Sequence, residues 1–496
     1  MQKLNVVNNW DRLNKKEIVK LQEERLRYFL TTQLLPYSPY YKKLFTDNKI
    51  LAEKIKIMED LHHIPFTTKD DIAPTIENPH KYRSIILQPD ETSLKKYLPL
   101  SRKLQILGDK IIKGDEYIRR ELDKEYRPLS LFFTTGRTAL PTAFACSLYD
   151  IELLHIIGER LVKILNLNPA NDRALNMFPY APHLAFWQVV YCGWAGGILI
   201  LSTGGGKVAG TGGNIQAIEK FKPTLLVGIP GYIYHILRQA EKEGHDFSFI
   251  KQVALGGDKV SQALKINIQK ILNNMGGKNP VVVSVLGFTE ARKCWIECPG
   301  ELSTGFHTYP DMEIFEIINP ETGEVLSPGE TGELVYTCID GRGSCVLRYR
   351  TGDIVEGGVT YEPCPQCKRT MPRISTNISR VSNIKDISIS KIKGTLVNLN
   401  VFMQILSENH SIEEWQIVIK KKNDDPFDLD ELLLYLAVKS GINEENLKNK
   451  LNEKFVDETE VHPNQIIITT LEDMLHRLGM DTKLKEERLL DLRPKK

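Results

Sequence analysis

Apolar residues near the start of the chain recur at the spacing of amphipathic helices. The clearest example spans residues 15–33, whose apolar positions include Ile18, Leu21, Leu26, Phe29 and Leu30. Because an α-helix repeats every 3.6 residues, this approximate spacing predicts a helix with one face toward a core. The first 125 residues are helical and charged in character throughout.

A different pattern begins near residue 130. Short runs of β-branched or aliphatic residues alternate with segments of helical spacing as far as residue 290. The runs lie at 225–227, 252–255 and 281–285, and the helical segments at 149–165, 232–242 and 261–272. Strand, helix, strand order requires crossovers between parallel strands, so this region predicts an α/β sheet covered on both faces.

Beyond residue 312 the pattern favours antiparallel pairing. Short strands are predicted at 312–318, 332–337 and 346–349. Turn-forming clusters such as residues 319–323 separate them, as is typical of strands joined by hairpins.

The last part of the chain has apolar strands of its own. They are predicted at 415–419, 431–438 and 465–469, with helical segments between them. This stretch is about 115 residues long, enough for a small α+β domain. We therefore expect two domains, residues 1–379 and residues 380–496.

The composition restricts the class of protein. The 496 residues carry 65 Lys and Arg against 63 Asp and Glu, a formal charge of +2, with 42% apolar residues. This excludes a disordered chain, and we expect no nucleic-acid partner. The N-terminus lacks the layout of a secretory signal, and the apolar stretch 186–201 is shorter than the roughly 20 residues that span a bilayer. We expect a cytoplasmic protein with no membrane partner.

Two glycine-containing segments are candidate loops. Thr134, Thr135, Gly136 and Thr138 follow an apolar run, and their hydroxyls and N–H groups suit phosphate oxygens. A plain turn is the alternative, since the Walker ending Gly-Lys-Ser/Thr is absent. The glycine-rich residues 203–213 lack the context of a dinucleotide fingerprint and predict an active-site loop instead.

Several motifs follow in a fixed order. They lie at residues 38–41, 65–71, 256–258, 286–290 (Leu-Gly-Phe-Thr-Glu), 318–325, 332–335 and 349–353 (Tyr-Arg-Thr-Gly-Asp). With the threonine turn, this order resembles the adenylate-forming superfamily of acyl- and aryl-CoA ligases, most closely its phenylacetate–CoA ligase branch, over nearly the whole chain. The resemblance implies an α/β fold with a large N-terminal lobe, combining mixed parallel sheets with an antiparallel β region, and a small mobile α+β C-terminal domain.

The resemblance also implies roles for individual residues. Those assigned to ATP are Thr134, Thr135, Gly136 and Thr138 at the triphosphate, Gly256, Gly257 and Leu286 along adenine, and Asp353 at the ribose hydroxyls. Thr289 would contact the α-phosphate, and Glu290 would bind Mg²⁺. Leu286 and Ala139 depart from the family, which usually has an aromatic ring and a glycine there, so aliphatic packing against adenine is expected.

Roles in the C-terminal domain follow from the same resemblance. Arg380 lies in the segment that resembles the hinge between lobes, and Gly394 in the turn that faces the pantetheine of coenzyme A. Lys485, three residues before Arg488, resembles the lysine of the adenylation step. Lys483 is the alternative, and a solvated, charged helix end is the non-catalytic interpretation.

A metal site is predicted from the cysteines. Cys364 and Cys367 form a Cys-x-x-Cys pair, a bite that suits two thiolates on one tetrahedral zinc ion. Cys298 and His307 offer the other half, as in a branch of phenylacetate–CoA ligase-like proteins, and four such ligands make the site structural. Cys294 is an alternative to Cys298. A redox Cys-x-x-Cys lacks the thioredoxin-like context here.

The expected function is an ATP-dependent carboxylate–CoA ligase. A small acyl or aryl acid and ATP would give an acyl-adenylate and pyrophosphate, and coenzyme A would then displace AMP. Two alternatives stay open, an adenylyltransferase that stops at an AMP-linked product and a non-catalytic nucleotide-binding protein. The sequence does not identify the acid, and it allows a homodimer.

Overall fold

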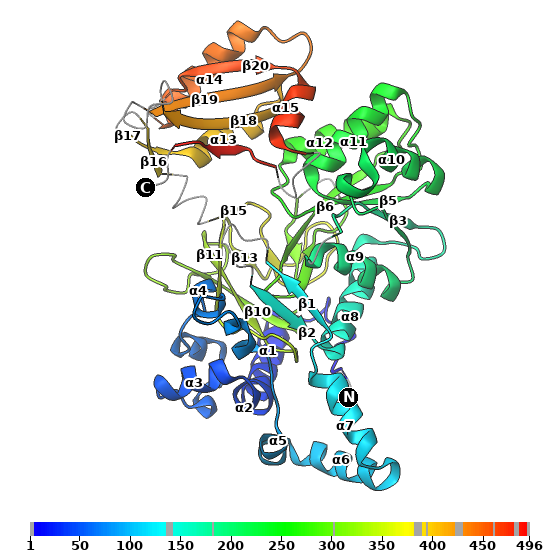
Figure 1. Ribbon diagram of the computed structural model, residues 1–496, viewed down its shortest axis with the longest axis vertical. Helices are drawn as coiled ribbons and strands as arrows, with labels where there is room; N and C mark the ends of the chain where they lie inside the picture. The colour runs from blue at the N-terminus through cyan, green and yellow to red at the C-terminus, as the bar shows by residue number, and fades with distance from the viewer. Residues whose placement is uncertain are drawn as a thin grey trace. The chain divides into compact units, whose positions relative to one another are not determined.

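The chain forms two compact units. The computed structural model describes residues 4–134, 142–180, 183–300, 303–380, 389–392, 395–421, 430–459, 462–480 and 486–493. Unit 1 comprises Met1–Ala174, Tyr180–Ile200 and Val283–Ile378, and unit 2 comprises Leu175–Pro179, Leu201–Val282 and Ser379–Lys496. Figure 1 shows their helices and strands.

Unit 1 begins with helices, as predicted. Their bounds are α1 Lys15–Phe29, α2 Leu35–Tyr37, α3 Pro39–Asp47, α4 Lys69–Ile72, α5 Glu91–Tyr97, α6 Leu100–Lys113, α7 Asp115–Tyr126, α8 Leu148–Leu165 and α9 Leu184–Ala195. Asn14 caps α1, because its side chain and that of Glu17 each accept the other residue's backbone N–H. A π-helical turn over Leu30–Leu34 continues α1, so the helix predicted over residues 15–33 is confirmed.

The antiparallel region contains β10 (Glu313–Ile318), β11 (Gly332–Cys338) and β12 (Tyr349–Val355), each paired with the next. A fourth strand, β15 (Ile378–Arg380), lies next to β12 in the same sheet. This confirms the predicted antiparallel pairing. The strand predicted at 346–349 is wrong in its bounds, since β12 begins where that prediction ends. The reason is Arg348, whose φ of 42° lies in the left-handed region and interrupts an extended chain.

The largest sheet contains nine strands in the order β13-β14-β9-β8-β7-β6-β5-β3-β4. Their bounds are β3 Arg173–Asn176, β4 Leu199–Ser202, β5 Leu225–Gly228, β6 Gln252–Gly256, β7 Val281–Phe288, β8 Lys293–Ile296, β9 Phe306–His307, β13 Val359–Thr360 and β14 Arg373–Ile374. β5 and β6 are parallel and are connected through α11 (Pro230–Glu243). The predicted α/β class is confirmed. A separate hairpin pairs β1 (Ser130–Phe133) with β2 (Ala143–Cys146).

Unit 2 packs α10 (Gly206–Phe221), α11 and α12 (Gln262–Asn274) around an apolar core. The loop predicted over residues 203–213 is wrong, because α10 begins inside it. Gly210, with φ of 65°, kinks this helix. The buried amide of Asn214 donates to the Gly205 and Gly210 carbonyls and so satisfies the backbone at the kink.

The C-terminal part of unit 2 is a small α+β fold. Its elements are β16 Ile389–Ile392, β17 Thr395–Asn398, α13 Leu399–Glu408, β18 Ile412–Lys421, β19 Asp430–Val438, α14 Glu444–Thr459, β20 Gln465–Thr469, α15 Leu471–Leu478 and β21 Leu489–Asp491. Four strands form a sheet in the order β20-β19-β18-β21. Phe402 and Phe455 stack at 4.2 Å in the apolar core beside it. The three strands predicted for this region are confirmed.

A buried carboxylate, Asp150, joins three segments of unit 1. Its oxygens accept hydrogen bonds from the backbone N–H groups of Ser147, Arg342 and Gly343. The Arg292 guanidinium lies 2.7 Å away, also buried. Burial alone would raise the pKa of Asp150, but Arg292 and these N–H groups hold the pKa below its ordinary value of 3.8.

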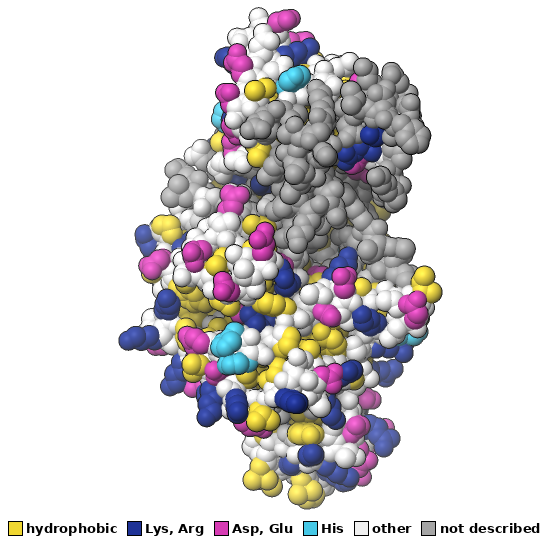
Figure 2. All heavy atoms as spheres, turned by 90° about the vertical axis from the view of Figure 1, so that its left-hand side faces the viewer, with side chains coloured by type: hydrophobic (Ala, Val, Ile, Leu, Met, Phe, Trp, Pro, Cys, Tyr) yellow, Lys and Arg dark blue, Asp and Glu magenta, His cyan; other side chains and the backbone are white. Residues whose placement is uncertain are grey.

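Helix α6 presents apolar side chains to solvent. Leu100, Leu104, Leu107 and Ile111 are 72%, 60%, 54% and 78% exposed. Figure 2 shows hydrophobic side chains beside basic ones at this end of unit 1. Among the described residues, no helix is long and apolar enough to cross a membrane.

Replacing Asp150 by asparagine is expected to destabilise the fold strongly. The change leaves the buried Arg292 charge uncompensated, which costs about 3 kcal/mol or more. Because the pKa of Asp150 is lowered in the fold, its contribution is present above pH 3.8 and is lost as pH falls through the folded value. Denaturant unfolding at pH 7 and at acidic pH measures both effects.

The matched control is Asp47→Asn, which breaks the exposed Lys43–Asp47 pair. Its cost should stay below about 0.5 kcal/mol. Equal losses in the two variants would contradict the role of Asp150.

Candidate active site and metal centre

The turn between β7 and β8 carries Thr289 and Glu290, both half-buried. The backbone N–H of Arg292 donates to the Thr289 carbonyl at 3.1 Å and closes the turn. Arg292 has a left-handed φ of 56°, and its side chain is anchored by Asp150. The turn is therefore tied to the buried interior, and its two polar side chains project from the end of β7.

Glu290 has a partner on β12. The Tyr349 hydroxyl donates to Glu290 Oε1 at 2.9 Å. Tyr349 itself is buried. The hydrogen bond orients a carboxylate for which the family resemblance implies a Mg²⁺ role, and carboxylate oxygens are the ligands this cation prefers.

β12 departs from regular pairing just before Asp353. Arg350 pairs with Val335 of β11, whereas Ile354 pairs with Glu333, so the register shifts between these positions. The additional residues on β12 form a bulge, a feature that redirects side chains at the edge of a ladder. Asp353 lies within this bulge.

Glu333 holds the bulge with both carboxylate oxygens. Oε2 accepts from the Arg350 guanidinium, with the Nε atom at 2.9 Å, and Oε1 accepts from the Gly352 N–H at 3.1 Å. Gly352 has a φ of 73°, which favours glycine. The Asp353 N–H donates to the Thr351 hydroxyl. The carboxylate of Asp353 is thereby presented from a well-supported backbone.

Glycines follow β6 in unit 2. β6 ends at Gly256, and Gly257 has a φ of 88°. A Cβ atom at Gly257 would lie 3.7 Å from the Phe178 ring, so an aromatic ring lies beside this backbone. Leu286, in unit 1, is a half-buried residue of β7 opposite Trp295 of β8.

The threonine turn is described only at its two ends. The Thr134 N–H donates to the Thr142 carbonyl, and the Thr142 N–H donates to the Thr134 hydroxyl at 3.2 Å. These bonds close the neck of the turn. Thr135, Gly136 and Thr138 lie outside the described residues, as does Ala139.

Only some of the predicted site residues of the C-terminal domain are among the residues that the structure describes. Gly394, Lys483 and Lys485 lie outside the described residues, and Arg380 ends β15. Arg488 lies three residues after Lys485, the spacing on which the Lys485 assignment rests. It is ion-paired with Glu414 and with Glu486, each at 2.7 Å. Burial raises the pKa of Glu486 to about 7.

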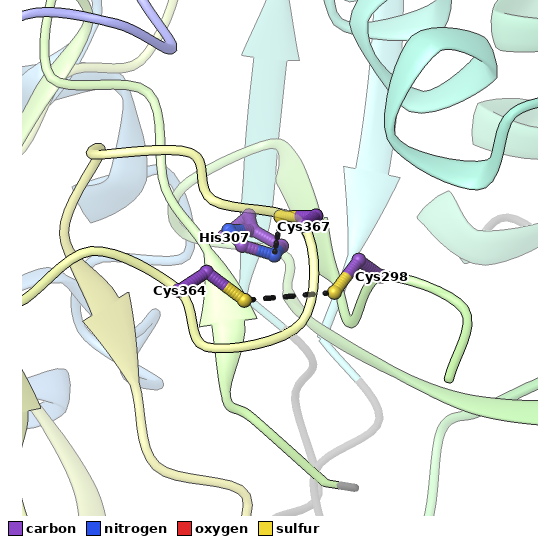
Figure 3. A group of neighbouring side chains, drawn as sticks. All are labelled: Cys298, His307, Cys364 and Cys367. Atoms are coloured by element: carbon purple, nitrogen blue, oxygen red, sulfur yellow. Dashed lines mark hydrogen bonds between the residues drawn. The ribbon is translucent and has the colours of Figure 1, made fainter. Parts of the chain in front are cut away.

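A second site lies in unit 1, where four predicted metal ligands meet. Cys298 follows β8, His307 lies on β9, and Cys364 and Cys367 belong to the segment between β13 and β14. One ligand atom from each lies within 4.8 Å of all the others. Figure 3 shows the four side chains pointing toward one another.

The spacing of these atoms suits a tetrahedral ion. Cys298 Sγ and Cys364 Sγ are 3.7 Å apart, and Cys367 Sγ and His307 Nε2 are 3.6 Å apart. With metal–sulfur bonds of about 2.3 Å, a tetrahedral S–S edge is about 3.8 Å. The Thr304 hydroxyl lies 3.5 Å and 3.4 Å from the Cys298 and Cys364 sulfurs.

Cys294 is not a member of this group. It lies on β8, and its carbonyl accepts a hydrogen bond from Tyr309. The geometry therefore brings together Cys298, and not the alternative cysteine, with the Cys-x-x-Cys pair.

Sequence reasoning missed four residues that support these sites: Phe178, Thr304, Glu333 and Tyr349. Tyr349 and Glu333 belong to recognised motifs, and their positions in those motifs were the available signal. Phe178 and Thr304 carried none, because the contacts that they make depend on how distant segments pack.

Comparisons with known proteins agree with this arrangement. The family model described as AMP-binding enzyme matches residues 71–344. Phenylacetate–coenzyme A ligase of Aromatoleum evansii is 24% identical over 76% of this chain and 74% of its own length. The protein of that name from Thermus thermophilus is 22% identical over 90% and 87%.

A solved structure shares the fold. The crystal structure of 2-hydroxyisobutyryl-CoA ligase in the postadenylation state aligns with a TM-score of 0.73 at 17% identity, covering 98% of this chain and 92% of that chain. This likeness supports an N-terminal large and a C-terminal small domain.

Glu333→Gln is expected to weaken ATP binding about tenfold, although Glu333 is not assigned a contact with ATP. The amide cannot accept from both Arg350 and the Gly352 N–H, so the bulge that presents Asp353 loosens, and a lost charged hydrogen bond costs about 1.5 kcal/mol. Calorimetric titration with ATP measures the effect. Glu324→Gln, at an exposed turn, is the control, and an ATP affinity unchanged in Glu333→Gln contradicts the positioning role.

Proposed function

The chain belongs to the AMP-binding enzyme family, and from that premise we propose that it is an ATP-dependent carboxylate–CoA ligase of the phenylacetate–CoA ligase type. The observation that carries the proposal is the pair of carboxylates on β12 and at the β7–β8 turn. Tyr349 reaches Glu290, and Asp353 follows four positions later on the same strand. One acid suits a divalent cation and the other the two ribose hydroxyls.

The first half-reaction makes an acyl-adenylate. A carboxylate oxygen of the acid attacks the α-phosphorus of ATP, the bond to the bridging oxygen breaks, and pyrophosphate leaves. We assign the triphosphate to the turn that begins at Thr134, the α-phosphate to Thr289 and the ribose to Asp353. When bound by Glu290, Mg²⁺ supplies positive charge to the phosphate oxygens.

Lys485 is the residue proposed to stabilise this step, with Lys483 as the alternative. An ammonium group between the carboxylate and the α-phosphate offsets the charge that develops there. Support comes from its position three residues before Arg488.

The second half-reaction transfers the acyl group. The coenzyme A sulfur attacks the acyl carbon, the carbon–oxygen bond to AMP breaks, and the thiol proton is released to solvent. AMP is a much better leaving group than the oxide of a free acid, which is why activation comes first. We propose that Gly394 faces the pantetheine, and that residues 380–496 swing about Arg380 between the two half-reactions.

The second part of the proposal is a structural zinc ion at Cys298, His307, Cys364 and Cys367. The donor set of three thiolates and one imidazole suits Zn²⁺, and the distances between the four atoms fit a tetrahedral shell. Four protein ligands leave no open position. When bound, the ion supplies a crosslink between segments about 60 residues apart, and no step of the reaction passes through it.

The proposal places the enzyme in the cytoplasm, where ATP and coenzyme A are available and thiols stay reduced. It includes a homodimer, for which α6 is the candidate surface, since Leu100, Leu104, Leu107 and Ile111 have the 4-3-4 spacing of a helix seam. A monomer mass in light scattering refutes the homodimer. Recovery of the protein outside the cytoplasmic fraction refutes the cytoplasmic location.

The two alternatives make different predictions. An adenylyltransferase would release pyrophosphate without any dependence of AMP release on coenzyme A. A non-catalytic nucleotide-binding protein, suggested by Leu286 and Ala139, would release none with any acid. The relatives' shared name favours the ligase.

Pyrophosphate release across a panel of aryl and acyl acids tests the function. At least one acid should give acid-dependent release from ATP, followed by AMP release that requires coenzyme A. Lys485→Ala should lower adenylate formation by about two orders of magnitude while preserving thioester formation from supplied acyl-adenylate. The proposal is refuted if no acid of the panel gives pyrophosphate release. The Lys485 assignment is refuted if Lys485→Ala slows adenylate formation and thioester formation equally.

Purified protein is expected to contain close to one zinc ion per chain. Cys364→Ser should lower the zinc content and the midpoint of thermal unfolding, because the metal stabilises the structure. The catalytic rate per folded molecule should fall less. Elemental analysis measures the zinc content, and thermal unfolding measures the midpoint. Cys294→Ser, outside the ligand group, should keep its zinc. A metal-free and fully active preparation contradicts the site.

A further inference from the structure

Tyr349 is the first residue of β12 and one of its most firmly held. Only 2% of it is exposed. On one side it pairs with Tyr336 of β11, and on the other it forms a parallel bridge with Thr67. The N–H of the next residue, Arg350, donates to the Thr67 carbonyl at 2.9 Å. The ring is thus fixed by a backbone that is paired on both edges.

The hydroxyl of this fixed ring lies 2.9 Å from Glu290 Oε1. Glu290 belongs to a turn between two strands of another sheet, so the bond joins the two sheets at the site. A phenol donates one proton, and a carboxylate oxygen has two lone pairs. Oε1 is therefore oriented by Tyr349, and the second oxygen, Oε2, has lone pairs of the kind that bind a cation.

We propose that Tyr349 is a positioning residue for the magnesium ligand Glu290. Metal-binding carboxylates are commonly held by a hydrogen-bonding partner, whose loss lowers metal affinity because the ligand must then be ordered at the moment of binding. The inference deepens the proposed function and rests on it, since it takes Glu290 to be the residue that meets the cation.

The position of Tyr349 on β12 adds a second consequence. Asp353 lies four residues further along the same strand, in the bulge held by Glu333. One strand thereby sets the metal carboxylate through the Tyr349 hydroxyl and the ribose carboxylate through its own backbone. Loss of the Tyr349 hydroxyl should therefore disturb the position of the Glu290 carboxylate and leave that of the Asp353 carboxylate unchanged.

Tyr349→Phe removes the hydroxyl and keeps the ring. Binding of α,β-methylene-ATP, an analogue that cannot be cleaved between its α- and β-phosphates, is measured by calorimetry with and without Mg²⁺. The Mg²⁺ affinity of the enzyme–analogue complex should fall about tenfold. Affinity for the analogue without Mg²⁺ should stay within about twofold, because Asp353 is unaffected. A Mg²⁺ titration identical to that of the wild type overturns the inference.

Tyr336→Phe is the matched control. Tyr336 is the cross-strand neighbour and is equally buried, and its hydroxyl accepts a hydrogen bond from Lys293 at 3.0 Å. Its Mg²⁺ titration should match the wild type. An equal loss in Tyr336→Phe would assign the effect to packing of the sheet and overturn the inference.

Glu290→Asp provides a variant that leaves the sheet intact. Its carboxylate is one methylene shorter, so it should lose the Tyr349 bond and weaken Mg²⁺ binding by itself. Tyr349→Phe should then add little in this background. Equal effects of Tyr349→Phe in both backgrounds show that the hydroxyl acts elsewhere, which overturns the inference.

Wild-type activity separates the two failures. Acid-dependent pyrophosphate release by the wild type, with an unchanged Mg²⁺ titration in Tyr349→Phe, overturns the inference and leaves the proposed function standing. A wild type that releases no pyrophosphate with any acid refutes the proposed function, and the inference fails with it.

Discussion

The buried ion pair between Asp150 and Arg292 is the interaction on which the interior of unit 1 depends. A carboxylate and a guanidinium removed from water must compensate each other, and this pair lies between α8 and the β7–β8 turn. The same carboxylate accepts from the backbone at Arg342 and Gly343, ahead of β12. The segments that lead to Glu290 and Tyr349 are thereby held by one buried charge.

The two sites share this framework. His307 on β9 pairs with Ile296 of β8, the strand that leaves the turn bearing Glu290, and also with Arg373 of β14. A metal ion at the four-ligand group would fix these strands next to the turn without taking part in chemistry. In the antiparallel sheet, Glu333 supports the β12 bulge by accepting hydrogen bonds from the Arg350 guanidinium and the Gly352 N–H. Rigid supports of this kind keep charged side chains in place before a ligand arrives.

Local patterns predicted most elements because their causes are local. The Asn14 capping box and the apolar face of α1, the parallel β5–β6 crossover, and the strands of the C-terminal fold all follow from nearby residues. Two predictions failed because a single residue or a single contact determined the local structure. The positive φ of Arg348 makes β12 begin later in the chain than predicted. The amide of Asn214 allowed α10 to form in a glycine-rich segment.

By itself, the sequence determined the α/β class and the order of the motifs, since these depend on spacing along the chain. The residues expected at ribose and magnesium were implied by the family resemblance that this order carries. The tertiary structure decided which cysteine joins Cys364 and Cys367, because ligand distances require the packing of strands 60 residues apart. It also brought the Tyr349 hydroxyl within hydrogen-bond distance of Glu290. A hydrogen bond between two sheets has no signature in either segment alone, as it exists only once both are folded.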